Sequence, residues 1–279
     1  MGTIQTDNSG AGGHSPAGRP WQVVSGSGIK IAGIILMTMD HLHQMFIAQG
    51  APDWLSWFGR PVATMFLFLC AEGFFYTHNR RRYLLQFLVG FFFMSAMNLI
   101  LSGAMPMEDI TLINNIFGTL FIASFYMWIL DLLRDGFSEK KPAKVLAAIG
   151  CFFLPFIISF ALILAIQYEY KTFAMILIFV PTPLSVEGGF VLVFMGVFFY
   201  ALRKYRIIQA ALILVISVLI WYSSRNSPGD FQWLMVFAVI PVLLYNGKRG
   251  KGGKYFFYVF YPAHIYLLYC TAWFLRVLA

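Results

Sequence analysis

The stretch IKIAGIILMTMDHLHQMFIAQ, residues 29–49, is an apolar run that contains an acid and two imidazoles. A helix needs about 20 apolar residues to cross roughly 30 Å of hydrocarbon, and this run is long enough to do so. Ionisable side chains inside such a span are costly unless they are paired or hydrated. The run therefore predicts a membrane helix, and Asp40, His41 and His43 predict that part of this helix faces a polar site rather than lipid.

The composition extends this prediction to the whole chain. Of the 279 residues, 59% are hydrophobic and only 11% are charged, which is far from the composition of a soluble globular domain. We therefore expect an all-α polytopic membrane protein. Apolar segments of spanning length lie at 29–49, 58–78, 82–102, 111–133, 144–167, 186–202, 206–223, 230–246 and 255–276, which gives nine spans in all.

A tenth apolar segment is too short to be counted with the others. Its core runs from Thr172 to Val180 and ends near Pro181 and Pro183, which favours a short re-entrant helix. With nine spans and a cytoplasmic N-terminus, most basic residues fall on the cytoplasmic side, as the positive-inside rule requires. Ten spans are the second choice. The expected location is the cytoplasmic (inner) membrane of a bacterium, in contact with membrane lipids.

The N-terminal segment, residues 1–28, differs from the rest of the chain. It is rich in Gly, Ser and Pro and predicts a disordered tail, which leaves 29–279 as one transmembrane domain. The net charge of +8 comes from clusters between apolar segments, so it indicates topology and excludes nucleic-acid binding. Cys70, Cys151 and Cys270 lie in apolar runs and do not suggest disulfides.

His41 is the best candidate for a catalytic base in the first span. Histidine can take and return a proton near neutral pH, and a nearby carboxylate can orient it. Asp40 is adjacent in sequence but about 100° around the helix, while Asp40 and His43 are at positions i and i+3. The sequence therefore does not decide whether His41 or His43 pairs with Asp40. In the alternative interpretation, the three residues only form hydrogen bonds to neighbouring helices. Lys30 lies about three turns before His41 on the same face.

Other polar residues point to a cavity inside the bundle. Glu72 in FLFLCAEGFFY has no local counter-ion and must face a cavity or a partner, and Arg60 precedes the same span. The last span contains Tyr261 and His264, for which a structural role is the more common one. Histidines at i and i+2 diverge on a helix, so we predict no metal site.

Four segments, in this order, resemble the TraX family. They are LMTMDHLHQ (36–44), FGRPVATMFLFLCAEGFFYTHNRRRYLLQFL (58–88), LLYNGKRG (243–250) and KYFFYVFYPAHIYLLY (254–269). The family is named for an acetyltransferase that caps conjugative pilin. Lys30 is followed by ten residues and then His41. This spacing of a basic residue and a histidine resembles a pattern of the acyltransferase-3 class of membrane acyltransferases.

The resemblance implies transfer of an acetyl group from cytoplasmic acetyl-CoA to an acceptor that the sequence does not identify: a peptide N-terminus, a glycan or a small molecule. It implies a catalytic role for His41 and places Arg60 and Glu72 at the reaction cavity. From the residues themselves we expect Asp40 to support His41, and His43, Tyr261 and His264 to lie around the same cavity. The CoA phosphates would be bound by Lys30, Arg80, Arg81, Lys248 and Arg249. Direct transfer and a transient acetyl-histidine are both open.

A proton-coupled transporter is the main alternative function. In that case Asp40, His41, Glu72 and His264 would form a proton relay across the membrane. The chain has no internal repeat of the kind found in many transporters, and its basic loops lie on one side. Both features favour a CoA-dependent enzyme. A structural scaffold would leave the polar residues of the first span unexplained.

Overall fold

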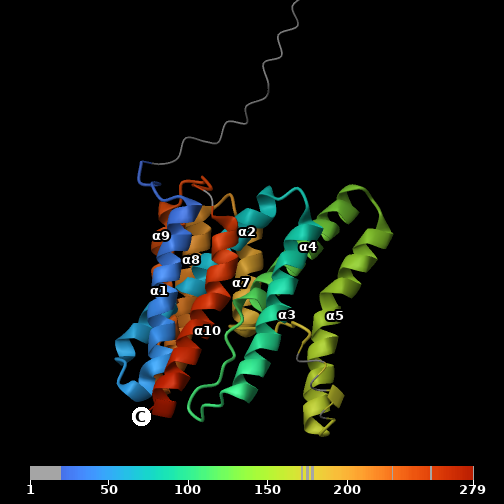
Figure 1. Cartoon of the computed structure of the whole chain (residues 1–279). Coiled ribbons are helices and arrows are strands. Elements are labelled where there is room, and N and C mark those ends of the chain that lie inside the picture. The colour runs from blue at the N-terminus through green and yellow to red at the C-terminus, as the bar shows by residue number, and fades with distance from the viewer. Residues whose placement is uncertain are drawn as a thin grey trace, which may run out of the picture.

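The computed structural model describes residues 20–170, 172–173, 176, 179–227, 229–251 and 253–278, and these form helices joined by loops (Figure 1). The α-helices are α1 (Gly26–Phe46), α2 (Val62–Tyr76), α3 (Arg80–Ala104), α4 (Ile116–Ser138), α5 (Pro142–Gln167), α7 (Gly189–Ala201), α8 (Arg206–Ser223), α9 (Val239–Leu244) and α10 (Lys254–Leu278). Short 3₁₀ helices lie at η1 (Ile47–Gln49), η2 (Asp53–Gly59), η3 (Ser224–Asn226) and η4 (Gln232–Ala238).

The helices have the properties of membrane spans. Among the described residues, six helical segments are long and apolar enough to cross a bilayer, and two shorter apolar helices cover Gly189–Ala201 and Gln232–Leu244. On α3, Val89, Phe93 and Ile100 are at least half exposed, which suits a surface in contact with lipid rather than water. The predicted all-α, multi-pass membrane class is confirmed.

Three more detailed predictions have different outcomes. The count of nine spans stays a prediction. The re-entrant helix at 172–180 lies partly, and the tail at 1–28 mostly, outside the described ranges. The described end of the tail is ordered: α1 begins at Gly26, three residues before the predicted start, because Ser25 caps it by accepting a hydrogen bond from the Gly28 N–H at 3.3 Å.

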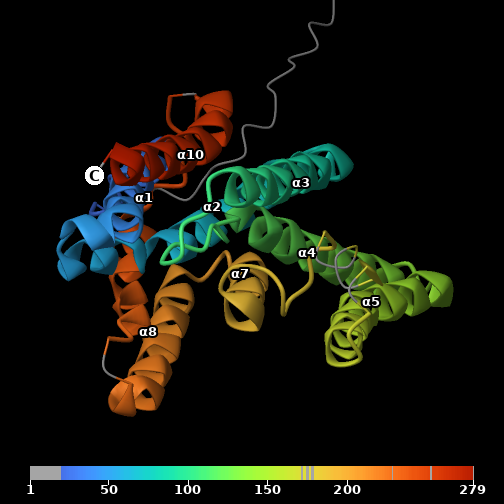
Figure 2. The same ribbon diagram turned by 60° about the horizontal axis from the view of Figure 1, so that its bottom comes forward.

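Helix α2 lies in the middle of the bundle. It packs against α1, α4 and α7, and its residues Leu67, Phe68 and Phe74 are almost completely buried. In the tilted view, α5 lies at one end of the molecule and α1, α8 and α10 lie at the other (Figure 2). The polar residues of α1 therefore face a protein interior that α2 and α10 help to form.

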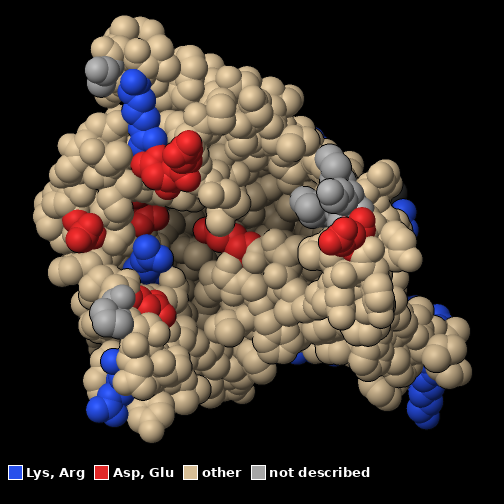
Figure 3. Space-filling view, turned by 90° about the horizontal axis from the view of Figure 1, so that it is seen from below, with Lys and Arg blue, Asp and Glu red and all other residues tan. Residues whose placement is uncertain are grey.

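The two ends of the bundle differ in charge. We call the upper end in Figure 1 the basic face: it holds the start of α1, the loop 245–251 and the start of α3 with Arg80, Arg81 and Arg82. The opposite face holds the loop 105–115 and the end of α10. Seen from below, the opposite face is hollowed near its centre, and several acidic side chains lie around the hollow with basic side chains among them (Figure 3).

The beginning of α1 is bound to the loop before α10. Val24 and Tyr245 form a β-bridge, and the backbone N–H groups of Gly26 and Ser27 donate to the carbonyls of Lys248 and Arg249 at 2.9 and 3.0 Å. These bonds use backbone donors that the first turn of a helix leaves without partners. They hold the loop 245–251 beside Lys30 at the basic face.

Close packing in the centre depends on Gly196 of α7. A Cβ atom at this position would lie 2.9 Å from Cδ2 of Leu67 on α2 and 3.1 Å from Cβ of Ala123 on α4. Small residues allow membrane helices to approach one another closely, and these contacts provide much of their association energy. Gly196 therefore sets the distance of α7 from both neighbours.

A larger residue at this position should destabilise the bundle. We expect Gly196→Leu to lower the free energy of unfolding in detergent by about 3 kcal/mol, because Leu67 and Ala123 cannot both move away. Gly103→Leu is the matched control, since a Cβ atom at Gly103 would have no neighbour within 4 Å. Equal thermal unfolding midpoints for the two variants would contradict this packing role.

Candidate active site at the histidine pair

The centre of the candidate site is a pair of histidines from the first and last described helices. Nδ1 of His41 on α1 lies 2.8 Å from Nε2 of His264 on α10, and both residues are buried. The two rings are stacked, with centroids 5.0 Å apart. Both histidines were expected near the reaction cavity, but the hydrogen bond between them was not predicted.

The hydrogen bonds determine which nitrogens carry protons. Nδ1 of His264 lies 2.8 Å from the carbonyl oxygen of Phe260, which can only accept, so this nitrogen donates. In a neutral ring Nε2 of His264 is then an acceptor, and Nδ1 of His41 donates to it. Nε2 of His41 consequently carries the lone pair. With both rings neutral, each of these two hydrogen bonds has one donor and one acceptor.

Asn114 completes the arrangement from the segment before α4. Its Nδ2 lies 3.2 Å from Nε2 of His41 and 3.1 Å from Oε1 of Gln44, so it can donate to both. This contact agrees with a lone pair on Nε2 of His41. Asn114 was not among the predicted site residues. In the sequence, a polar site at this position is indicated by the adjacent pair Asn114 and Asn115 at the beginning of an apolar segment.

The loop that carries Asn114 is attached to α10 on the opposite face. The Tyr269 hydroxyl donates to the carbonyl of Met105 at 2.7 Å, and Arg276 forms a double hydrogen bond with Asp109, one of 2.7 Å. The bond to Arg276 lowers the pKa of the Asp109 carboxyl. Because folding lowers this pKa, the stabilisation that the contact contributes is fully present above the pKa of Asp109 in the unfolded chain. It is lost as the pH falls through the pKa of Asp109 in the folded protein.

Asp40 and His43 face other partners. The Asp40 carboxylate lies 3.7 Å from the Arg60 guanidinium and is within electrostatic range of His43. No described hydrogen bond joins Asp40 to His41 or His264. A Cβ atom at Gly59 would lie 2.3 Å from Cγ of Asp40, so only glycine leaves room for the acid. Nε2 of His43 is 3.9 Å from Asp53. The predicted support of His41 by Asp40 therefore has no direct contact in the structure.

A second carboxylate lies near Asp40 and Arg60. Glu187, in the loop before α7, is within electrostatic range of both. Its Oε2 accepts from the backbone N–H of Asn115 at 3.2 Å, and its carbonyl accepts from Thr119 at 2.7 Å. These contacts place a carboxyl group close to the segment that carries Asn114.

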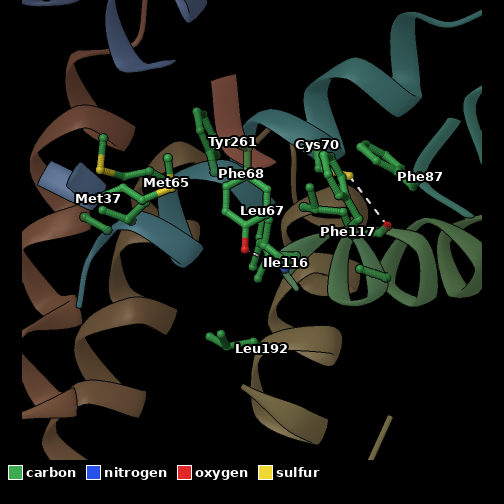
Figure 4. Close-up of a cluster of buried hydrophobic side chains, with 14 of the residues drawn as sticks. Met37, Met65, Leu67, Phe68, Cys70, Phe87, Ile116, Phe117, Leu192 and Tyr261 are labelled. Atoms are coloured by element: carbon green, nitrogen blue, oxygen red, sulfur yellow. Dashed lines mark hydrogen bonds between the residues drawn. The ribbon is translucent and has the colours of Figure 1, made fainter. Parts of the chain in front are cut away.

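A cavity of about 490 Å³ extends from the basic face toward the histidines. At the basic face it is lined by Gly26, Lys30, Gly247 and Arg249. Its lining also includes Met37, one turn before His41, and Tyr261, one turn before His264. The Tyr261 hydroxyl accepts from the backbone N–H of Ile116 at 3.0 Å, a contact visible in Figure 4. The cavity thus leads to within about one helical turn of the histidine pair.

Glu72 lines the same cavity and is paired. Its Oε2 lies 3.0 Å from Nη2 of Arg206, and its Oε1 is buried without a hydrogen-bond partner in the described structure. The Arg206 guanidinium also lies over the rings of Phe68 and Tyr245, at 4.8 and 5.1 Å from their centroids. Sequence inspection could not find this counter-ion, because it comes from a distant helix.

The predicted phosphate-binding residues are not all at the cavity. Lys30 and Arg249 line it, and Lys30 lies 5.0 Å above the Phe257 ring. Arg80 instead forms an ion pair with Asp131, and the exposed Arg81 and Lys248 are outside the lining residues. Within the described ranges, no three His, Cys, Asp or Glu side chains form a group that could hold a metal ion.

Comparison with known proteins assigns the chain to a family. The family model described as TraX protein matches residues 25–272, which include both histidines and the cavity. The chain belongs to the TraX family. The resemblance inferred from the four segments is confirmed, while the relation to the acyltransferase-3 class stays a prediction.

A curated relative has a name related to pili. This TraX chain is 27% identical over 265 residues to the probable fimbrial assembly protein FimC, serogroup H1, of Dichelobacter nodosus. The match covers 88% of the chain and 93% of the relative. No solved structure matches.

The pair formed by Glu72 and Arg206 can be tested through stability. Glu72→Leu leaves a guanidinium without its carboxylate and should cost about 3 kcal/mol, the low end of the range for a buried pair because Arg206 keeps 19% of its side chain exposed. The double variant Glu72→Leu/Arg206→Leu should recover most of that loss in thermal unfolding. Additive losses in the double variant would show that the two residues act independently.

Proposed function

We propose that this protein is a membrane-embedded acetyltransferase that moves an acetyl group from acetyl-CoA to an amine or hydroxyl acceptor, with His41 as general base. The observation that supports this most directly is the position of His41. Its Nε2 lone pair lies next to Asn114 and the opposite face, while the cavity from the basic face ends about one turn away. A donor and an acceptor arriving from opposite sides would meet at this nitrogen.

The donor would bind from the basic face, which we propose to be cytoplasmic. Basic residues gather on the cytoplasmic side of bacterial inner-membrane proteins, and Lys30 and Arg249 at the cavity suit the CoA phosphates. The volume of about 490 Å³ is typical of a small-molecule site. From Lys30 to His41 the helix rises about 16 Å, a distance that the extended thioester arm would bridge.

The acceptor would bind from the opposite face. The curated relative is called a fimbrial assembly protein, and TraX is associated with pilin, which makes a pilin-like peptide the first acceptor to test. The carboxyl groups of Asp40 and Glu187 near this face can accept hydrogen bonds from an amine acceptor, which attacks in its neutral form. A glycan or a small molecule with a hydroxyl group is the other acceptor class.

The chemical step needs one proton transfer in each direction. The acceptor's N–H or O–H proton moves to Nε2 of His41 as its heteroatom bonds to the thioester carbonyl carbon. The carbon–sulfur bond then breaks, and the proton passes from Nε2 to the leaving sulfur. The products are the acetylated acceptor and free CoA. We favour this direct transfer over an acetyl-histidine because it requires no second acyl transfer.

The histidine pair does not suit the alternative function as a transporter. Nδ1 of His264 donates to a backbone carbonyl, and a carbonyl cannot accept a proton and pass it onward. A proton that enters at His41 therefore has no exit through His264. This geometry supports a base that takes and returns a proton at one nitrogen.

Binding and transfer by the purified protein test the proposal. The wild-type protein should bind acetyl-CoA in calorimetry and acetylate a pilin-like peptide, as detected by mass spectrometry. His41→Ala should keep the binding and lower the transfer rate about 10²- to 10⁴-fold, the usual contribution of a general base. Failure of the wild-type protein to bind acetyl-CoA would refute the function; transfer by His41→Ala at the wild-type rate would refute only the base.

The position of the donor can be tested separately. Lys30→Ala and Arg249→Ala should each weaken acetyl-CoA binding about tenfold, equal to about 1.4 kcal/mol, because each removes a charge beside the phosphates. Lys204→Ala is the matched control, since Lys204 is exposed and does not line the cavity. An equal loss in all three variants would indicate general attraction to the basic face rather than binding in the cavity.

A further inference from the structure

We propose that His264 is a positioning residue that keeps the proton of His41 on Nδ1 and thereby leaves Nε2 unprotonated and able to act as the base. The role in catalysis rests on the proposed acetyl transfer. The effect on the tautomer does not, because it follows from the hydrogen bonds alone. The two parts can therefore be tested separately.

His264 is itself held in one orientation by its own helix. Its Nδ1 donates to the carbonyl of Phe260, four residues earlier, at 2.8 Å. Its ring also stacks on the Phe260 ring, with centroids 4.9 Å apart and an angle of 12° between the planes. Because α10 fixes both the proton and the plane of the ring, Nε2 of His264 points toward α1 as an acceptor.

This acceptor determines the state of His41. Among the described residues, the hydrogen-bond partner of Nδ1 of His41 is Nε2 of His264, at 2.8 Å. A neutral imidazole carries one proton, and the hydrogen bond made by one nitrogen sets the state of the other. With the proton held on Nδ1, the lone pair is on Nε2, next to Asn114 and the proposed acceptor side.

A histidine suits this position better than the carboxylate that usually orients a catalytic histidine. A carboxylate would bring a negative charge into the membrane interior, where an ionised group is costly. The nearby acid, Asp40, is paired with Arg60 at 3.7 Å. When His41 takes a proton on Nε2, its Nδ1–H still donates to His264, which stabilises the positive ring without an additional charge.

Nitrogen NMR of the full-length protein tests the tautomer directly. The chain has five histidines, and ¹⁵N-histidine labelling in detergent with single substitutions assigns their signals. At a pH where both rings are neutral, His41 should show a protonated Nδ1 and a bare Nε2 in the wild type. His264→Gln offers an amide oxygen near the position of Nε2 and should keep this state, whereas His264→Leu should lose it.

Transfer rates provide the second measurement. His264→Leu should lower kcat about 100-fold, as expected when a general base adopts the wrong tautomer, with acetyl-CoA affinity unchanged within twofold. His264→Gln should recover at least tenfold of that loss. His78→Leu is the control, because His78 is exposed at the turn before α3, and it should change neither rate nor tautomer.

Each outcome has a separate meaning. A proton on Nε2 of His41 in the wild-type protein would overturn the role of His264, whether or not transfer occurs. Full activity of His264→Leu would also overturn its role in catalysis. If the wild type shows the expected tautomer but transfers no acetyl group to any acceptor, the acetyltransferase function fails and the control of the tautomer stands. Thermal unfolding of both His264 variants separates these effects from loss of the fold.

Discussion

The hydrogen bond between His41 and His264 joins the first and last described helices in the interior of the bundle. Polar groups in hydrocarbon must find partners within the protein, and these two histidines satisfy one another without a charge. Asn114 brings the segment before α4 to the same point. The positions of α1, α4 and α10 around the candidate site are thus linked by neutral side chains, while the charged pairs lie to either side.

Those charged pairs divide the site into two parts. Toward the basic face, Lys30, Arg249 and the Glu72–Arg206 pair surround a cavity whose remaining walls are largely aromatic and aliphatic. Toward the opposite face, Asp40 and Arg60 lie within electrostatic range of Glu187. His41 is between the two groups. The proposed transfer, in which donor and acceptor arrive from opposite faces, requires this separation.

The sequence predicted the class of the fold because long apolar segments can satisfy their backbone hydrogen bonds in lipid only as helices or closed barrels. It also identified His41 and Glu72, because an ionisable residue in an apolar run is conspicuous. It could not supply their partners. Arg206 reads as part of a basic loop and His264 as a structural residue beside Pro262, and only the packing of distant helices brings them to Glu72 and His41.

Asn114 and the start of α1 show two other limits. An asparagine at the end of a loop has no pattern that distinguishes it from a turn residue, so its position beside His41 depends on the anchoring of the loop to α10. The predicted start of the first helix was late because Gly and Ser were read as part of the tail. Ser25 caps the helix there, and the loop 245–251 accepts its first N–H groups.

The candidate site needs residues from both α1 and the segment 245–264, and this determines when it can form during synthesis. Helix α1 leaves the ribosome before α10, so His41 cannot pair with His264 until α10 has entered the membrane. The cavity also lacks Arg249 and Tyr261 until that stage. An incomplete chain therefore has neither the complete cavity nor the histidine pair, and the proposed acetyl transfer could begin only after the bundle is closed.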